Sequence, residues 1–465
     1  MGELQAVILA AGEGQRMRSA VPKVLHPLCG RPMLCYILDC ATAVAGEPLI
    51  VVGHDADLVR EHIGPRRRYA LQEKQLGTGD ALMQALPQLP QEGRLLVLCG
   101  DTPLLEREHL ELLLREHGDN AATIMTTRLP DPTGYGRVLR DPGGLVQRVV
   151  EEGDASAAEK KVCEINSGTY CFDIKLLRRF LPRLSPENVQ REYYLTDILA
   201  VLREQGHPVG ACTVEDWQVA LGINDRCQLA EAAAVMGARI NRSLMRRGVT
   251  LVDPSTTYID YGVEIGADTV ILPQTLIEGD TTIGAACRIG PATQITDAQI
   301  GDGVTIRQSV VQGSILESAA VVGPFAHIRP GCRIGEEAKV GTFVEVKNSA
   351  IGAASKLPHL SYAGDADIDG GVNIGAGAII VNYDGRKKHR SHIGAGAFIG
   401  CNSSLISPLE IGEGAFVAAG TTVTGDVPAG ALAIARQSQK NCEGLGKRLL
   451  TKKPEQEKDM REEKE

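Results

Sequence analysis

Residues 259–300 read IDYGVEIGADTVILPQTLIEGDTTIGAACRIGPATQITDAQI, and every sixth position from Ile259 to Ile295 is isoleucine. Aliphatic residues return at the same spacing over 322–346 and 393–423, with one-residue slips of phase at Ile300, Ile351 and Ile368. A period of six fits neither a helix nor an isolated strand. It predicts a parallel β-helix of hexapeptide repeats, in which each of three flat faces supplies one inward aliphatic residue and turns at a small one. A β sandwich, the alternative, would show period two.

The first half of the chain alternates short apolar runs with helical patterns. Strands are expected at 4–9, 49–52, 95–99 and 121–126, and helices at 32–45 and 107–117. Such alternation is typical of an α/β fold with a mostly parallel sheet covered by helices on both faces. Ligands bind such sheets beyond the carboxyl ends of the strands. Gly12 and Asp101 both follow strands of this kind.

We expect an α/β domain over 1–226, a helix over 227–247 and the β-helix domain over 248–465. The helix carries apolar residues at helical spacing, and it is either a linker or the last helix of the first domain. Residues 381–392, VNYDGRKKHRSH, interrupt the repeat and predict a protruding loop with no repeat contacts of its own. The charged tail from about residue 450 is predicted to be disordered.

Composition excludes several classes of protein. The net charge of -9 over 465 residues argues against a general nucleic-acid binder. The 12 cysteines are scattered without a Cys-x-x-Cys pair, which predicts reduced, buried thiols in the cytoplasm. Neither a signal peptide nor an apolar run of about 18 residues for a membrane helix is visible. We therefore expect a cytoplasmic protein without nucleic-acid or membrane partners.

Residues 9–17 read LAAGEGQRM and lie between an expected strand and a helix. Met17 stands where a dinucleotide-binding loop has its third glycine, which disfavours hydride transfer. What remains is a tight loop whose N–H groups could wrap phosphates. Arg16 and Lys23 are placed to add positive charge, although each alone would be an ordinary surface residue.

Together with Pro22-Lys23, this loop resembles the sugar-1-phosphate nucleotidyltransferases. Further segments match that family in order: Gln72, Gln75-Leu76-Gly77-Thr78-Gly79, Gly100-Asp101-Thr102-Pro103-Leu104, Gly134-Tyr135-Gly136-Arg137, Glu151, Glu164-Ile165-Asn166-Ser167-Gly168 and Asn224. With the repeats behind it, the chain from about residue 4 to 440 resembles the bifunctional enzymes that join an N-acetylglucosamine-1-phosphate uridylyltransferase to a glucosamine-1-phosphate N-acetyltransferase. The resemblance implies a left-handed β-helix, a homotrimer and two-step synthesis of UDP-N-acetylglucosamine, acetylation first, for peptidoglycan, lipopolysaccharide and other cell-envelope polymers.

In the first domain the resemblance implies a site for UTP, UDP-N-acetylglucosamine and Mg²⁺. Lys23 would stabilise the α-phosphate and Arg16 the leaving pyrophosphate, so both count as catalytic. Asp101 and Asn224 would hold the Mg²⁺ by oxygen atoms, although Asn224 is alternatively the N-cap of the following helix. The nucleotide would contact Leu9, Ala10, Ala11, Gly12, Lys23, Gln72, Gly77, Thr78, Gly136, Glu151, Asn166 and Asn224.

Two residues of the glycine-rich loop depart from the family. Relatives often carry a basic residue in place of Glu13 and threonine in place of Gln15. A carboxylate beside a triphosphate is repulsive, so the Glu13 side chain is expected to point away from the nucleotide.

His359 lies among the repeats, where a lone histidine is more often structural than catalytic. Arg329, Lys347, Tyr362 and Asn373 recur on nearby coils, which stack about 4.8 Å apart. A γ-type zinc carbonic anhydrase would need three metal histidines, and only His327 is placed to join His359. The resemblance implies instead that His359 is the general base that deprotonates the amine of glucosamine 1-phosphate for attack on acetyl-CoA.

The resemblance also implies the ligand contacts of this second site. Glucosamine 1-phosphate would contact Arg329, Lys347, Tyr362, Asn373 and Lys388, and acetyl-CoA would contact Ala376, Asn382, Tyr383, Cys401, Ala419 and Arg436. Cys401 stands where many relatives have serine, and a thiol is the weaker hydrogen-bond donor. In a trimer the loop 381–392 could cross to a neighbouring prism and bring Asn382, Tyr383 and Lys388 over the next chain's His359.

Two other functions remain open at this point. A different sugar-1-phosphate nucleotidyltransferase with a regulatory β-helix would leave His359, Lys347 and the loop without a role. A non-enzymatic scaffold would be expected to lack phosphate-site residues, yet Arg16, Lys23 and Asp101 are all present.

Overall fold

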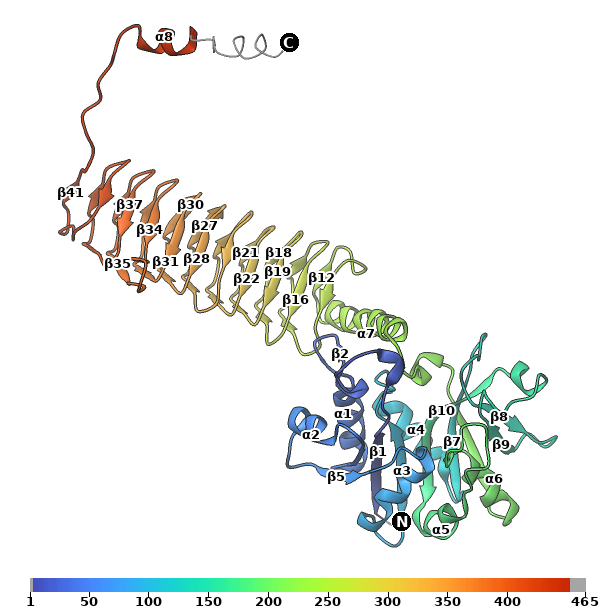
Figure 1. The fold of residues 1–465 in the computed structure, drawn as a ribbon. Coiled ribbons are helices and arrows are strands. Elements are labelled where there is room, and N and C mark those ends of the chain that lie inside the picture. The colour runs from blue at the N-terminus through green and yellow to red at the C-terminus, as the bar shows by residue number, and fades with distance from the viewer. Residues whose placement is uncertain (1–2, 452–465) are drawn as a thin grey trace, which may run out of the picture. The chain divides into compact units, whose positions relative to one another are not determined.

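The protein divides into two compact units, Met1–Thr281 and Thr282–Glu465, of which the computed structural model describes residues 3–451 (Figure 1). The segment 452–465, which belongs to the predicted disordered tail, lies outside the described residues. Within 3–451, no helix is both long and apolar enough to cross a bilayer.

The first unit is built on a mixed sheet. Its strands follow the order β11 (Val209–Thr213), β7 (Ala122–Arg128), β10 (Glu164–Asp173), β6 (Arg94–Cys99), β1 (Leu4–Ala10), β4 (Leu49–Val52) and β5 (Arg68–Leu71). Only β10 runs antiparallel to both of its neighbours in this order. A hairpin of β8 (Arg137–Arg140) and β9 (Val146–Val150) extends from β10. The prediction of a mostly parallel sheet is confirmed.

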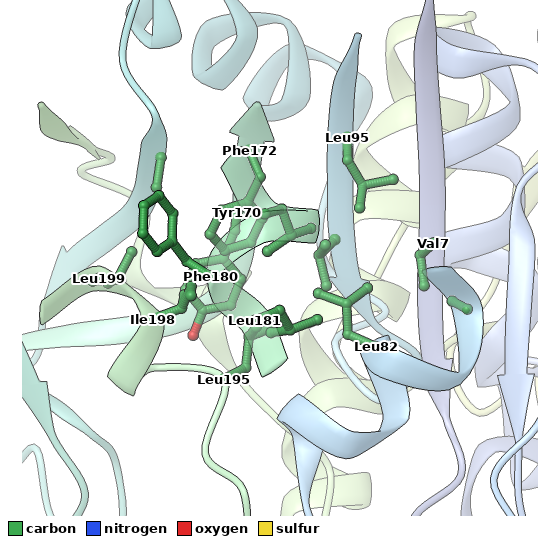
Figure 2. Packing of buried hydrophobic residues seen from close by; sticks show 14 of the residues in the cluster. Val7, Leu82, Leu95, Tyr170, Phe172, Phe180, Leu181, Leu195, Ile198 and Leu199 are labelled. Atoms are coloured by element: carbon green, nitrogen blue, oxygen red, sulfur yellow. The ribbon is translucent and has the colours of Figure 1, made fainter. Parts of the chain in front are cut away.

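Helices cover both faces of this sheet. Val7 and Ile8 are successive residues of β1, and they point into two separate cores because side chains alternate along a strand. The core at Val7 contains side chains of α3 (Thr78–Ala85), α5 (Ile174–Phe180) and α6 (Asp197–Glu204), as the packing around Leu82 and Phe180 shows (Figure 2). The core at Ile8 contains side chains of α1 (Met33–Ala45), α2 (Ala56–Ile63) and α4 (Arg107–His117).

A long helix and the first repeats complete the first unit. Helix α7 (Arg226–Arg246) packs through Met236 against a core that includes Met33 and Tyr36. The repeats of this unit are β12 (Thr250–Leu251), β13 (Tyr258–Ile259), β14 (Glu264–Ile265), β15 (Val270–Ile271) and β16 (Leu276–Glu278). A hairpin of β2 (Pro27–Leu28) and β3 (Arg31–Pro32) meets the repeats, since the Cys29 carbonyl accepts a 2.9 Å bond from the Tyr261 amide. The helix forms where its spacing predicts, and the domain limits at 226 and 247 stay a prediction.

The second unit consists of three parallel sheets, one for each face of the coil. The first holds β18 (Arg288–Ile289), β21 (Thr305–Ile306), β24 (Val321–Val322), β27 (Lys339–Thr342), β30 (Lys356–His359), β33 (Asn373–Ile374), β36 (Phe398–Ile399), β39 (Phe416–Val417) and β41 (Leu432–Ala433). The second holds β19 (Gln294–Thr296), β22 (Val310–Gln312), β25 (His327–Ile328), β28 (Glu345–Lys347), β31 (Tyr362–Gly364), β34 (Ile379–Val381), β37 (Ser404–Ile406) and β40 (Thr422–Val423). The third holds β17 (Thr282–Ile283), β20 (Gln299–Ile300), β23 (Ile315–Leu316), β26 (Arg333–Ile334), β29 (Ala350–Ile351), β32 (Ala366–Ile368), β35 (Ser391–Ile393) and β38 (Glu410–Ile411). A short helix, α8 (Leu445–Thr451), follows the last strand.

The hexapeptide pattern translates directly into burial. Ile289, Val322 and Ile393, which belong to the periodic aliphatic set, are fully buried. Small residues two positions before the aliphatic ones are buried as well, and the sequence pattern did not predict that. Ser361 is an example, and its hydroxyl donates to the His359 carbonyl at 2.7 Å. The second unit is the left-handed parallel β-helix that the resemblance implies.

Candidate functional sites

The glycine-rich loop follows β1 and leads into a short 3-10 helix, η1 (Gln15–Met17). Gly14 adopts φ 64°, a left-handed conformation that favours glycine. A Cβ atom at this position would lie 2.6 Å from the Cβ of Lys23. Gly14 therefore lets the base of the Lys23 side chain pack directly against the loop.

The loop forms one wall of a cavity of about 930 Å³, a volume suited to a nucleotide-sized ligand. Residues 9–12, Arg16 and Lys23 come from the loop and from the residues after it. Most of the other predicted nucleotide and metal residues also line this cavity: Gln72, Gly77, Thr78, Asp101 and Asn224. The structure therefore brings together residues that are more than 200 positions apart in the sequence.

Lys23 lies between the two predicted metal ligands. Its ammonium is 2.5 Å from Oδ2 of Asp101 and 3.1 Å from Oδ1 of Asn224. The Asn224 side chain therefore faces the cavity, and Asp225 caps α7 by accepting a bond from the Gln228 amide. The alternative role of Asn224 as N-cap is wrong, because the helix begins one residue later than the sequence suggested. The carboxylate and the amide oxygen converge on one point, as ligands of a single cation would.

Three predicted nucleotide residues lie together outside the lining of the cavity. The Asn166 amide donates to the Gly136 carbonyl at 2.9 Å, and a Cβ on Gly136 would lie 3.1 Å from Oε2 of Glu151. Glu151 accepts a 3.0 Å bond from the Thr196 hydroxyl. Burial raises the pKa of the Glu151 carboxyl, and the nearby Asp197 and Asp154 act in the same direction.

Sequence reasoning missed several residues that line the cavity. Glu152, Gly153, Gln190 and Glu192 belong to segments without a periodic pattern. A Cβ atom on Gly77 would lie 2.9 Å from the Cβ of Glu192. The glycine therefore indicated that another segment packs closely here, but the sequence did not identify that segment. Gln75 lay within a matched motif, and its buried Nε2 atom has no hydrogen-bond partner among residues 3–451.

The two departures in the glycine-rich loop contact each other. The Gln15 amide donates to a Glu13 carboxylate oxygen at 2.6 Å, and both residues line the cavity, contrary to the expectation that Glu13 points away from the nucleotide. Gln15 therefore gives the Glu13 carboxylate a hydrogen-bond donor at this wall of the cavity. A threonine at position 15 is too short to donate the same bond.

A basic cluster marks the second site, in the second unit. The Lys347 ammonium lies 3.7 Å from the Asp365 carboxylate. A hydrogen bond with the neighbouring Lys347 side chain, together with the like charge of that residue, lowers the pKa of Lys388. Arg329 acts on the pKa of Lys388 in the same direction, and its guanidinium pairs with Glu345 at 3.0 Å. Three close cations against the two carboxylates of Asp365 and Glu345 leave an excess of positive charge, which is suited to a phosphate group.

The loop after β34 is anchored on its own chain, which corrects the expectation that it lacks repeat contacts. Asn382 is only 7% exposed, and its amide donates to Asp365 at 2.5 Å and lies 3.5 Å from the Tyr362 hydroxyl. At the other end of the loop, Arg390 pairs with Asp367. The Asn382 amide nitrogen is therefore held by the coils of its own chain, and crossing of the loop to a neighbouring prism stays a prediction. Tyr383 remains exposed in the hairpin that it forms with Lys388.

His359 and Asn373 are less closely tied to this cluster. His359 ends β30, is exposed, and stands opposite Thr342 on the previous coil. Two residues separate it from Tyr362 around the corner to β31. Asn373 begins β33 on the next coil, opposite Lys356, and therefore lies three positions along the sheet from His359. Asp365, which binds both Lys347 and Asn382, had no sequence signal because it is a corner residue with φ 50°.

The residues predicted for acetyl-CoA follow one corner of the β-helix. The Ala376 carbonyl accepts a 2.8 Å bond from the amide of Asn402, next to Cys401. The Cys401 carbonyl accepts a 2.8 Å bond from the amide of Gly420, next to Ala419. Arg436 donates to the Ala419 carbonyl. Ala376, Cys401, Ala419 and Arg436 therefore form a column across successive coils, with the Cys401 side chain exposed.

The cysteines are free, and not all are buried. All twelve lie within the described residues, and no disulfide joins any of them. Cys163, Cys227, Cys401 and Cys442 are exposed, which corrects the prediction of uniformly buried thiols. Cys99, which lines the cavity of the first unit, is partly buried, and burial raises the pKa of its thiol to about 12.

Comparisons with known proteins agree with this division. A model of the MobA-like NTP transferase domain matches residues 6–250, one of the GMPPB C-terminal domain matches 254–351, and one of the bacterial transferase hexapeptide (six repeats) matches 390–425. Three relatives are each named bifunctional protein GlmU. That of Heliobacterium modesticaldum is 50% identical over 444 residues, 95% of this chain and 97% of the relative. Those of Brevibacillus brevis and a Geobacillus species are each 50% identical, over 95% and 96% of this chain and 96% and 98% of the relative.

Proposed function

The chain belongs to the family of bifunctional GlmU proteins, and we propose how its two sites share the synthesis of UDP-N-acetylglucosamine. The enzyme acetylates glucosamine 1-phosphate with acetyl-CoA, and it transfers a uridylyl group from UTP to N-acetylglucosamine 1-phosphate with release of pyrophosphate. We assign uridylyl transfer to the cavity of the first unit and acetyl transfer to the basic cluster of the second. The observation that carries this assignment is the convergence of Lys23, Asp101 and Asn224 in the first cavity.

Uridylyl transfer needs positioning and charge neutralisation more than covalent help. The N–H groups of the loop 11–14 face the triphosphate, and Lys23 and Arg16 balance its charge. The phosphate oxygen of the sugar attacks the α-phosphorus, and pyrophosphate leaves on the side of Arg16. Gly136, Glu151 and Asn166 contact the sugar and nucleotide from the neighbouring strands, while Gln72, Gly77 and Thr78 hold the base.

The first site fits Mg²⁺. Asp101 and Asn224 offer a carboxylate and an amide oxygen to one point, and Mg²⁺ prefers oxygen ligands and keeps several waters. Bound there, the ion would neutralise charge on the phosphates. Asp101 and Asn224 are therefore the residues that we assign to the metal.

In the second site His359 takes the proton from the sugar amine, which attacks the thioester carbonyl of acetyl-CoA; the C–S bond breaks, and coenzyme A leaves as its thiol. Lys347, Lys388 and Arg329 hold the phosphate of glucosamine 1-phosphate, with Tyr362 and Asn373 on the sugar. Acetyl-CoA lies along the column of Ala376, Cys401 and Ala419, with Asn382, Tyr383 and Arg436 at its ends. Asp365 positions Lys347 and Asn382 by its bonds to both.

A direct test is to supply glucosamine 1-phosphate, acetyl-CoA, UTP and Mg²⁺ and to follow UDP-N-acetylglucosamine by chromatography. Omission of acetyl-CoA should stop the product, and addition of N-acetylglucosamine 1-phosphate should restore it. The alternative, another sugar-1-phosphate nucleotidyltransferase with a regulatory β-helix, predicts a nucleotide sugar but no acetyl transfer. The product would supply cell-envelope polymers. The free thiols favour the cytoplasm as the location of the protein.

Glu13→Gln is expected to lower the KM for UTP about two- to fivefold, with little change in kcat. The substitution removes one exposed negative charge from the wall of the cavity, where such charges contribute about 0.2 to 1 kcal/mol and slow the approach of an anion. Steady-state uridylyl transfer measures the effect. Glu3→Gln, on an exposed residue that does not line the cavity, serves as the control, and an unchanged KM for Glu13→Gln would remove Glu13 from this role.

We also propose that three copies assemble through their prisms. Phe325, Phe343 and Leu360 follow one another at a corner of successive coils, with exposed fractions of 51%, 58% and 60%. The two phenylalanine rings stack at 5.3 Å. All three residues have a positive φ, which is uncommon for bulky side chains. An exposed apolar ridge of this kind marks a protein interface. Its last residue, Leu360, is next to His359.

Phe343→Asp is expected to shift the protein from trimer to monomer in light scattering after size-exclusion chromatography. Assembly would bury the new carboxylate at the interface without a partner, and the loss of its hydration opposes association. Tyr258→Asp is the matched control, because Tyr258 is 65% exposed and belongs to the first unit. Retention of the trimer by Phe343→Asp would exclude the ridge as the interface.

A further inference from the structure

Lys23 occupies the point at which the oxygen atoms of Asp101 and Asn224 converge. Its side chain is 12% exposed and that of Asp101 is 22% exposed, so the ion pair is largely shielded from water. The frame that holds the two oxygen atoms is tied together, because the Ile223 amide donates to the Asp101 carbonyl at 2.9 Å. The ammonium of Lys23, on its flexible four-carbon stem, is the part of this group that can leave.

We propose that the Lys23 ammonium and a divalent cation compete for the same oxygen atoms of Asp101 and Asn224. This inference rests on the proposed role of these two residues as metal ligands. An ammonium 2.5 Å from Oδ2 of Asp101 already occupies a lone pair that a metal would use, and two cations at one point repel each other. The free protein therefore holds a divalent cation weakly.

Nucleotide binding resolves this competition. A phosphate offers the Lys23 ammonium a new oxyanion partner in a charge-assisted hydrogen bond. Once Lys23 turns to the phosphate, Asp101 and Asn224 are released for the metal. Because coupling between two ligands is reciprocal, the metal in turn tightens the nucleotide. Lys23 thus delays firm metal binding until the substrate is present.

Replacement of Lys23 should separate this competition from catalysis. Lys23→Met removes the ammonium and leaves the Asp101 carboxylate unpaired, so the free protein should bind Mn²⁺ about tenfold more tightly than wild type. Lys23→Arg keeps a cation at the site and should retain weak binding. Lys175→Met, on an exposed lysine of α5, should behave as wild type.

The experiment is a titration of the full-length protein with Mn²⁺, without nucleotide, in which electron paramagnetic resonance reports the free ion. Mn²⁺ shares the oxygen preference of Mg²⁺. Tighter binding by Lys23→Met that disappears in the double variant with Asp101→Asn supports the proposal. Equal or weaker binding by Lys23→Met, with binding still dependent on Asp101, overturns it.

Two controls keep the outcomes distinct. If Asp101→Asn leaves Mn²⁺ binding unchanged in both backgrounds, the metal assignment itself fails, which is a different result from absence of competition. Circular dichroism verifies the fold of each variant. If Lys23→Met does not fold, Lys23→Gln removes the same charge with a polar side chain, and the same tightening is expected of it.

Discussion

Asp101→Ala is expected to lower uridylyl transfer by about 10³-fold or more and to leave acetyl transfer nearly unchanged. The substitution removes the carboxylate that faces Lys23 and Asn224, which is the acidic group at the point of convergence. Loss of one preorganised electrostatic contact at a reacting centre typically costs about 10² to 10³ in rate, and loss of a metal ligand adds to that. The residues that we assign to acetyl transfer belong to the second unit.

The two activities are measured separately for this variant, with N-acetylglucosamine 1-phosphate and UTP in one assay and glucosamine 1-phosphate and acetyl-CoA in the other. Asp57→Ala, at a side chain that is 99% exposed on α2, controls for removal of a carboxylate from the first unit. Equal loss of both activities in a folded Asp101→Ala protein would contradict the assignment of one reaction to each unit.

The β-helix was predictable because its periodicity is a direct record of burial. Each aliphatic residue at the spacing of six points inward, so Ile289 and Val322 identify the core without knowledge of the contacts. The buried serine and threonine residues two positions earlier were not predicted. Their hydroxyls bond to backbone carbonyls at the corners, as that of Ser361 does with His359, and hydrophobicity alone does not reveal this.

The candidate sites were predictable only in part. The resemblance named residues that do converge, such as Lys23, Asp101 and Asn224, from distant positions in the sequence. It did not reveal that Lys23 would lie between the other two, because a motif carries no side-chain conformation. Position 225 rather than 224 caps α7, a distinction of one residue that propensities do not resolve. Asp365 escaped notice because its role depends on Lys347 and Asn382, which reach it from adjacent coils.

His359→Ala is expected to have the opposite effect to Asp101→Ala. Removal of a general base typically costs about 10² to 10⁴ in rate, so acetyl transfer should fall by that factor while uridylyl transfer on N-acetylglucosamine 1-phosphate stays at the level of wild type. His359 is exposed at the end of β30, and its side chain has no hydrogen bond within the described residues that would give it a structural role. The fold should therefore tolerate the substitution.

A histidine elsewhere on the same β-helix provides the control for this variant. His392 lies in β35, on a different sheet, and bonds to Asp369 at 3.0 Å and to Glu410 at 2.5 Å. His392→Ala removes an imidazole with more hydrogen-bond partners than that of His359, so any loss of stability from losing a histidine should be larger for this variant. Acetyl transfer should nevertheless stay within a few-fold of wild type. If acetyl transfer by His359→Ala also stays within a few-fold of wild type, with KM for glucosamine 1-phosphate unchanged, the general base must be another group. The basic cluster around Lys347 would then bind the phosphate, and His359 would take no part in the proton transfer.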